Sequence, residues 1–226
     1  MIKRIVRKVE NKILRTGIRS FDEFKKLKQF VQLDLKTLEQ NNNKLTPFYS
    51  QYVNEVSRPD MAASLELAAF QYTICKMNQY RKVLDMGSGF SSFVFRLYAK
   101  ETPGVHVFSV DDDEAWLEKT KKFLRQHELE TENMIMLNQF LKSNESGFDC
   151  ILHDLNFVEV RINYLTQIVA LIKKSGVIIL DDVHKPDYLH EVLVKLKNIK
   201  AKTYFLKPVT LDRYGRYSLA LIKEQD

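Results

Sequence analysis

The stretch VLDMGSGFSS, residues 83–92, has the residue types of a ligand-binding loop. An apolar run ends at Asp85 and is followed by Gly87 and Gly89, which is the order strand, glycine turn, helix of nucleotide-binding sites. A nicotinamide fingerprint would place a third glycine where Ser92 stands. The carboxylate of Asp85 would repel a pyrophosphate but suits a ligand that brings positive charge to the loop. The stretch therefore predicts a cationic nucleoside ligand rather than a dinucleotide.

Further carboxylates follow the apolar runs that come later in the chain. Asp111 ends the second run, where an acid can accept hydrogen bonds from ribose hydroxyls. Asp154 ends the fourth run, and Asp181 with Asp182 ends the fifth. Because these two strands should be neighbours, the last three carboxylates should converge and repel one another unless a cation compensates them. A hard divalent cation is the economical compensation, and it would lower the pKa of a substrate hydroxyl.

The pattern from Arg81 onward predicts the elements that position these residues. Short β-branched runs alternate with amphipathic helices, which is typical of a parallel sheet with crossover helices on both faces. We predict strands at 82–86, 105–110, 133–137, 149–153, 176–181, 201–206 and 217–222. Helices are predicted at 91–101, 113–128, 157–173 and 187–197. The stretch LKPVTLDRYGR leaves no room for a crossover helix, so the last two strands should form an antiparallel hairpin at the sheet edge.

The first 59 residues read as a helical extension. Apolar residues at helical spacing predict a basic amphipathic helix that Gly17 ends. Ser20 with Glu23 resembles a capping box that opens a second helix, with an apolar face from Phe21 to Leu38 and its end at the run 40–43. A short aromatic helix should span 46–56. A longer helix from Asp60 to about Met77 leads into the sheet domain, which we place at 60–226.

Charge and cysteine usage narrow the class of protein. The formal charge of +6 equals that of residues 1–20, where Glu10 alone opposes seven basic residues, so the remaining 206 residues sum to zero. This distribution does not predict nucleic-acid binding. The basic arm could pack on its own domain, on a second subunit of a homodimer, or on an anionic membrane as a peripheral contact. Cys75 and Cys150 lack the spacing of metal or disulfide sites, and no span or signal is evident, so we expect buried thiols in a cytoplasmic protein.

Four motifs in order make the chain resemble a class I S-adenosylmethionine-dependent methyltransferase from about Asp60 to Lys223. They are VLDMGSGFSS, VFSVDDD, FDCILHD and GVIILDD, followed by the terminal hairpin RYGRYSLALI. The resemblance implies a Rossmann-like sheet of seven strands with the last strand antiparallel. It also implies a cofactor whose ammonium and sulfonium suit an acidic loop. The residues carried over for cofactor binding are Asp85, Gly87, Ser88, Gly89, Phe90, Asp111, Asp112, Gln139 and Asp154.

The carboxylates resemble those of the metal-dependent catechol, sugar and natural-product O-methyltransferases. That resemblance implies that Asp154, Asp181 and Asp182 bind Mg²⁺ or another divalent cation. The catechol family places a lysine three residues after the first of these aspartates, where this chain has Phe157. His184, on the loop after Asp182, is our candidate for the base that takes the hydroxyl proton, and an ordinary exposed loop histidine is the alternative.

The expected function is methyl transfer to a hydroxyl of a small molecule with metal assistance. One alternative is a metal-independent N- or O-methyltransferase in which Asp181 and Asp182 accept hydrogen bonds from an amine. Another is a non-catalytic membrane-associated or scaffolding protein on the same fold. The aromatics of PFYSQY, residues 47–52, with the SRPD turn, residues 57–60, either form part of a lid over the site or simply pack the extension onto the sheet.

Overall fold

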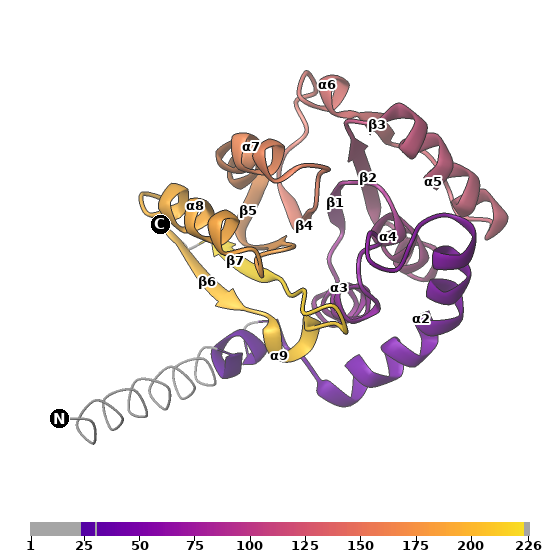
Figure 1. Cartoon of the computed structure of the whole chain (residues 1–226), viewed down its shortest axis with the longest axis horizontal. Helices are drawn as coiled ribbons and strands as arrows, with labels where there is room; N and C mark the ends of the chain where they lie inside the picture. Colours follow the sequence, from indigo (N-terminus) through magenta and orange to yellow (C-terminus); the bar gives the residue numbers. More distant parts are fainter. Residues whose placement is uncertain (1–23, 30, 224–226) are drawn as a thin grey trace.

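The computed structural model describes residues 24–29 and 31–223. Its centre is a seven-stranded sheet in the order β3-β2-β1-β4-β5-β7-β6, in which β7 alone runs antiparallel to its neighbours (Figure 1). The strands are β1 (Lys82–Met86), β2 (His106–Asp111), β3 (Met134–Met136), β4 (Phe148–His153), β5 (Ile172–Leu180), β6 (Ala201–Phe205) and β7 (Leu219–Lys223). The predicted Rossmann-like fold with a terminal antiparallel hairpin is confirmed.

Helices cover both faces of the sheet (Figure 1). One face packs on α2 (Leu35–Glu55), α3 (Leu65–Asn78), α4 (Phe90–Glu101) and α5 (Glu114–Gln126). The other packs on α6 (Leu137–Phe140), α7 (Val158–Leu171) and α8 (Pro186–Leu196), and α9 (Lys207–Thr210) lies between β6 and β7 in the chain. Side chains of a strand alternate between the faces, so Val83 belongs to the first core and Leu84 to the second.

The register of the central strands places the predicted site residues at one edge of the sheet. Met86 pairs with His153, and His153 pairs with Leu180. The residues that follow each strand, Gly87, Asp154 and Asp181, therefore lie level with one another at the carboxyl ends. Open α/β sheets bind their ligands at this edge.

The helical extension differs from the prediction. The second predicted helix is interrupted after residue 29, and α2 begins at Leu35, where the Asp34 carboxylate accepts a hydrogen bond from the N–H of Thr37. The Asn run does not end a helix, because buried Asn41 donates to Thr73 Oγ1 across the α2–α3 contact and α2 continues to Glu55. Ser64 caps α3, so that helix begins five residues later than predicted.

Three further predictions concern the cysteines, the basic arm and the absence of a membrane span. Cys75 and Cys150 are free and buried, as expected. The basic arm, residues 1–20, lies outside the described residues. Within residues 24–29 and 31–223, no helix combines the length and apolar character that crossing a membrane requires.

Candidate active site

A cavity of about 510 Å³ opens at the carboxyl edge of the sheet. This volume lies within the usual range of small-molecule sites. Its walls come from the loops after β1, β2, β4 and β5, from the helical extension, and from the β6–β7 connection. Among the lining residues are Tyr52, Asp60, Met61, Gly87, Ser88, Gly89, Phe90, Asp111, Trp116, Asp154, Arg161, Asp181, Asp182, His184, Lys185, Tyr214 and Arg216.

The glycine loop packs directly against the end of β4. Gly87 has φ +108°, and a Cβ there would lie 2.2 Å from the backbone oxygen of Asp154. Its N–H donates to the carbonyl of Val110 at 2.8 Å, which fixes the loop to β2 as well. Only glycine fits this position. The loop therefore directs the N-terminus of α4, which begins at Phe90, toward the cavity.

Asp111 is tied to the same loop. Its Oδ2 accepts hydrogen bonds from Ser88 N at 2.6 Å and from Ser88 Oγ at 2.7 Å, and its Oδ1 accepts from Asp113 N at 3.0 Å. Burial raises the pKa of Asp111, while the hydrogen bonds from Ser88 oppose that rise. Asp113 also caps α5 through Trp116 N. The structure thus brings the predicted residues Gly87, Ser88, Gly89, Phe90 and Asp111 to one half of the cavity, which we call the loop half.

Asp85 lies behind the loop rather than in the cavity. Its side chain is fully buried against α4 and accepts a hydrogen bond from Ser92 Oγ, and its Oδ1 has no partner. Burial raises the pKa of Asp85 to about 7. Strand alternation points this side chain into the first core, so the structure does not support a direct contact with the ligand.

Two other predicted residues also lie outside the cavity lining. Gln139 is exposed, and its Oε1 accepts from Met136 N at 3.4 Å, so it caps its own short helix. Asp112 is half-buried beside the loop half. Trp116, which the sequence analysis missed, lines this region, and its Nε1 donates to the carbonyl of Ser88 at 2.6 Å. An indole in the first turn of the helix that follows Asp111 was the signal in the sequence.

The predicted convergence of Asp154, Asp181 and Asp182 is confirmed, but the premise that they lack compensation is wrong. Arg161 Nη2 lies 2.7 Å from Asp154 Oδ1, and Arg161 Nη1 lies 3.3 Å from Asp182 Oδ2. Lys185 Nζ lies 2.7 Å from the same oxygen of Asp182. The arginine lies between the two loops, at the place that the prediction assigned to a metal ion.

The third carboxylate is held differently. Ser218 Oγ donates to Asp181 Oδ1 at 2.7 Å. Burial, followed by the charge of Asp182, raises the pKa of Asp181. Burial alone would raise the pKa of Asp182 as well, but the hydrogen bond from Lys185 and the charge of Arg161 lower it. Among the described residues, no three His, Cys, Asp or Glu side chains are arranged to hold a metal ion, so the donor set does not fit the predicted divalent cation.

His184 lines the cavity beside these carboxylates. Its Nδ1 lies 3.6 Å from Asp182 Oδ1 and has no hydrogen-bond partner, and its side chain is 25% exposed. His153 is packed within the sheet, as expected, and its Nε2 lies 2.9 Å from the carbonyl of Arg161. Burial lowers the pKa of His153 to about 4, which keeps its ring neutral. Of these two histidines, only His184 lines the cavity, in the half that we call the acceptor half.

The helical extension and the hairpin close the acceptor half. Arg216 donates to the carbonyls of Pro59 and Asp60 at 3.1 and 3.0 Å, and its Nε donates to Asp212 at 2.7 Å. These bonds fasten the turn after α2 to the β6–β7 connection. Residues 47–52 were predicted either to cover the site or to pack the extension onto the sheet, and each prediction fits one of their residues. Tyr52 lines the cavity, whereas the ring of Phe48 packs on Phe93 with centroids 5.0 Å apart.

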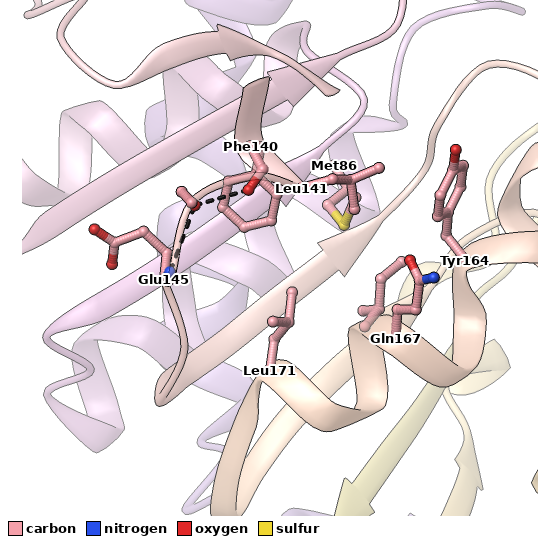
Figure 2. A pocket seen from close by; sticks show the side chains of 9 residues that line it. Met86, Phe140, Leu141, Glu145, Tyr164, Gln167 and Leu171 are labelled. Carbon is pink, nitrogen blue, oxygen red and sulfur yellow. Dashed lines mark hydrogen bonds between the residues drawn. The ribbon is translucent and has the colours of Figure 1, made fainter. Parts of the chain in front are cut away.

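A second cavity of about 490 Å³ lies between the segment after β3 and helix α7. Figure 2 shows Phe140 and Leu141 from the segment after β3, Met86 from the end of β1, and Tyr164 and Gln167 projecting from α7. None of the predicted site residues lines this cavity. The candidate active site is therefore the first cavity.

Comparisons with known proteins agree with this geometry. The family model described as "Methyltransferase domain" matches residues 78–213. No curated protein shows a significant match to the sequence. Among solved structures, the O-methyltransferase TomG from Streptomyces achromogenes, in complex with S-adenosylmethionine, is 15% identical with a TM-score of 0.56, over 85% of this chain and 92% of that one.

Two further structures show the same fold at low identity. The O-methyltransferase from Bacillus cereus in complex with S-adenosylhomocysteine is 15% identical with a TM-score of 0.59, over 87% of this chain and 94% of that one. The S-adenosylhomocysteine-bound methyltransferase PaMTH1 from Podospora anserina is 12% identical with a TM-score of 0.61, over 80% and 88% of the two chains. The chain therefore belongs to the methyltransferase domain family, and it is a class I S-adenosylmethionine-dependent methyltransferase.

Proposed function

We propose that the enzyme transfers a methyl group from S-adenosylmethionine to a hydroxyl group of a small molecule. The observation that carries this proposal is a single cavity with the glycine loop and Asp111 in one half and the pair His184–Asp182 in the other. One half suits a nucleoside cofactor, and the other offers a proton acceptor.

The loop half fits the cofactor by its shape and its charge. The close approach of Gly87 to the end of β4 leaves backbone rather than side chain facing the ligand. Asp111 offers carboxylate oxygens at the place where ribose hydroxyls bind in this fold class. The lining carries more carboxylates than basic groups, which favours a ligand with positive charge.

When bound, S-adenosylmethionine supplies a methyl group on a positively charged sulfur, and the sulfur keeps the bonding electrons as the methyl moves to the acceptor oxygen. The chain's own residues then have two tasks. The enclosed acceptor half holds the hydroxyl group oriented toward the loop half. Holding two reacting groups in the right geometry lowers the barrier of the reaction. His184 takes the hydroxyl proton as the new carbon–oxygen bond forms, and Asp182 stabilises the imidazolium that results.

Transfer to an amine is the second candidate, and the acidic lining favours it. Asp60, Asp181 and Asp182 could accept hydrogen bonds from a protonated amine before it loses its proton. The neighbours named as O-methyltransferases support the hydroxyl instead.

Labelled methyl transfer distinguishes the two acceptors. The full chain is incubated with methyl-labelled S-adenosylmethionine and with pairs of small aromatic compounds that differ only in hydroxyl or amino substitution. We expect label on oxygen, with S-adenosylhomocysteine formed in equal amount. Label on nitrogen alone would contradict the hydroxyl proposal and establish the amine alternative.

A further inference from the structure

Arg161 is the most completely bonded cation in the cavity wall. It lies in the first turn of α7, and its side chain is 6% exposed. Its Nε donates to the carbonyl of Leu155, and its Nη2 contacts the carbonyl of Asn156 at 3.3 Å and Asp154 Oδ1 at 2.7 Å. Its Nη1 reaches Asp182 Oδ2 at 3.3 Å. One side chain thus joins the loop after β4 to the loop after β5.

The backbone of Arg161 is fixed as well. Its N–H donates to the carbonyl of Phe157 at 3.1 Å, and its own carbonyl lies 2.9 Å from Nε2 of buried His153. A guanidinium held at both its backbone and its side chain is preorganised, and it keeps its charge at every pH that a protein tolerates. Its position does not depend on a ligand.

The guanidinium contacts one oxygen of each of two carboxylates that were predicted to bind a metal ion. Asp154 Oδ1 faces Arg161, and Asp182 Oδ2 faces both Arg161 and Lys185. A divalent cation placed among these carboxylates would lie close to the fixed guanidinium of Arg161 and to the ammonium of Lys185, and both would repel it. Asp181 is satisfied separately by Ser218.

We infer that Arg161 is a positioning residue that supplies the fixed positive charge of the acceptor half in place of a divalent cation. It holds the Asp182 carboxylate beside His184, whose Nδ1 lies 3.6 Å from Asp182 Oδ1, and methyl transfer proceeds without metal. This inference rests on the proposed function for the role of His184. The claim about the cation itself does not, because metal binding can be measured without turnover.

The first test titrates metal into the protein. Calorimetry with Mn²⁺ and with Mg²⁺ is run on the wild type, on Arg161→Gln and on Arg161→Lys. We expect no site in the wild type or in Arg161→Lys, because the positive charge persists. Arg161→Gln should gain a Mn²⁺ site at least about tenfold tighter than any residual binding by the wild type, because Asp154 and Asp182 lose the cation that contacts both. Arg213→Gln is the matched control, since it removes an exposed arginine that contacts Tyr214 rather than these carboxylates, and it should gain no site.

The second test needs only the wild type, so it decides the inference even if Arg161→Gln does not fold. Exhaustive dialysis against a chelator should leave both the affinity for S-adenosylhomocysteine and the rate of methyl transfer unchanged. A wild-type Mn²⁺ site as tight as that of Arg161→Gln would overturn the inference, and so would a rate that falls on chelation and returns with Mn²⁺. If no acceptor is methylated at all, the proposed function fails, while the metal titrations still decide the role of Arg161.

Discussion

Gly87→Ala is expected to abolish cofactor binding and to lower the free energy of unfolding by about 3 kcal/mol or more. Two effects add at this position. The backbone φ of +108° is one that alanine avoids, and the new Cβ would lie 2.2 Å from the backbone oxygen of Asp154, which cannot move without displacing the end of β4. Urea denaturation measures the loss of stability, and calorimetry with S-adenosylhomocysteine measures the loss of affinity.

Gly147→Ala separates the two effects. Gly147 also has positive φ, at +73°, but a Cβ there would meet no atom within 4 Å. That control should cost only the conformational penalty, about 1 kcal/mol, and leave cofactor affinity unchanged. Equal losses in the two variants would show that the contact between the glycine loop and β4 does not shape the site.

His184→Ala is expected to lower kcat by a factor of about 10² to 10⁴, the range that general bases contribute. The imidazole lines the acceptor half and lies beside Asp182, whereas the affinity for S-adenosylhomocysteine depends on the loop half and should not change. The variant should also change how the rate depends on pH, because the group proposed to accept the hydroxyl proton is gone.

His190→Ala is the control for His184. It lies on the next helix, is exposed, and does not line the cavity. Its rate and pH profile should match those of the wild type. If His184→Ala keeps the wild-type pH profile, the histidine takes no part in proton transfer, and one of the cavity carboxylates becomes the candidate.

The sheet domain could be predicted because its local signals agree with its final packing. The buried segments VLDM of β1 and GVIIL of β5 are largely apolar or β-branched, and the glycine loop marks the junction of β1 and α4. The helix boundaries of the helical extension could not be predicted, because contacts between residues far apart in the sequence determine them. A run of three asparagines is a poor helix former in isolation, yet Asn41 is buried against Thr73, 32 residues away.

The sequence predicted the carboxylates of the site but not the arginine that pairs with them. Counting acids at strand ends gave Asp154, Asp181 and Asp182, but the partner comes from a helix seven residues after the first of them. Arg161 shares the buried face of α7 with Leu165. A charged residue on an apolar helical stripe indicates a buried ion pair. This pattern could have predicted an arginine, rather than a metal ion, beside the carboxylates.

The cavity should bind S-adenosylmethionine rather than a nicotinamide dinucleotide. Calorimetric titration of the full chain with S-adenosylmethionine, S-adenosylhomocysteine and NAD tests it most directly. We predict binding of the first two at one site per chain and none of the third, with Asp111→Asn weakening both because it removes the charged acceptor for the ribose. Tight binding of NAD without binding of either S-adenosyl compound would contradict the account.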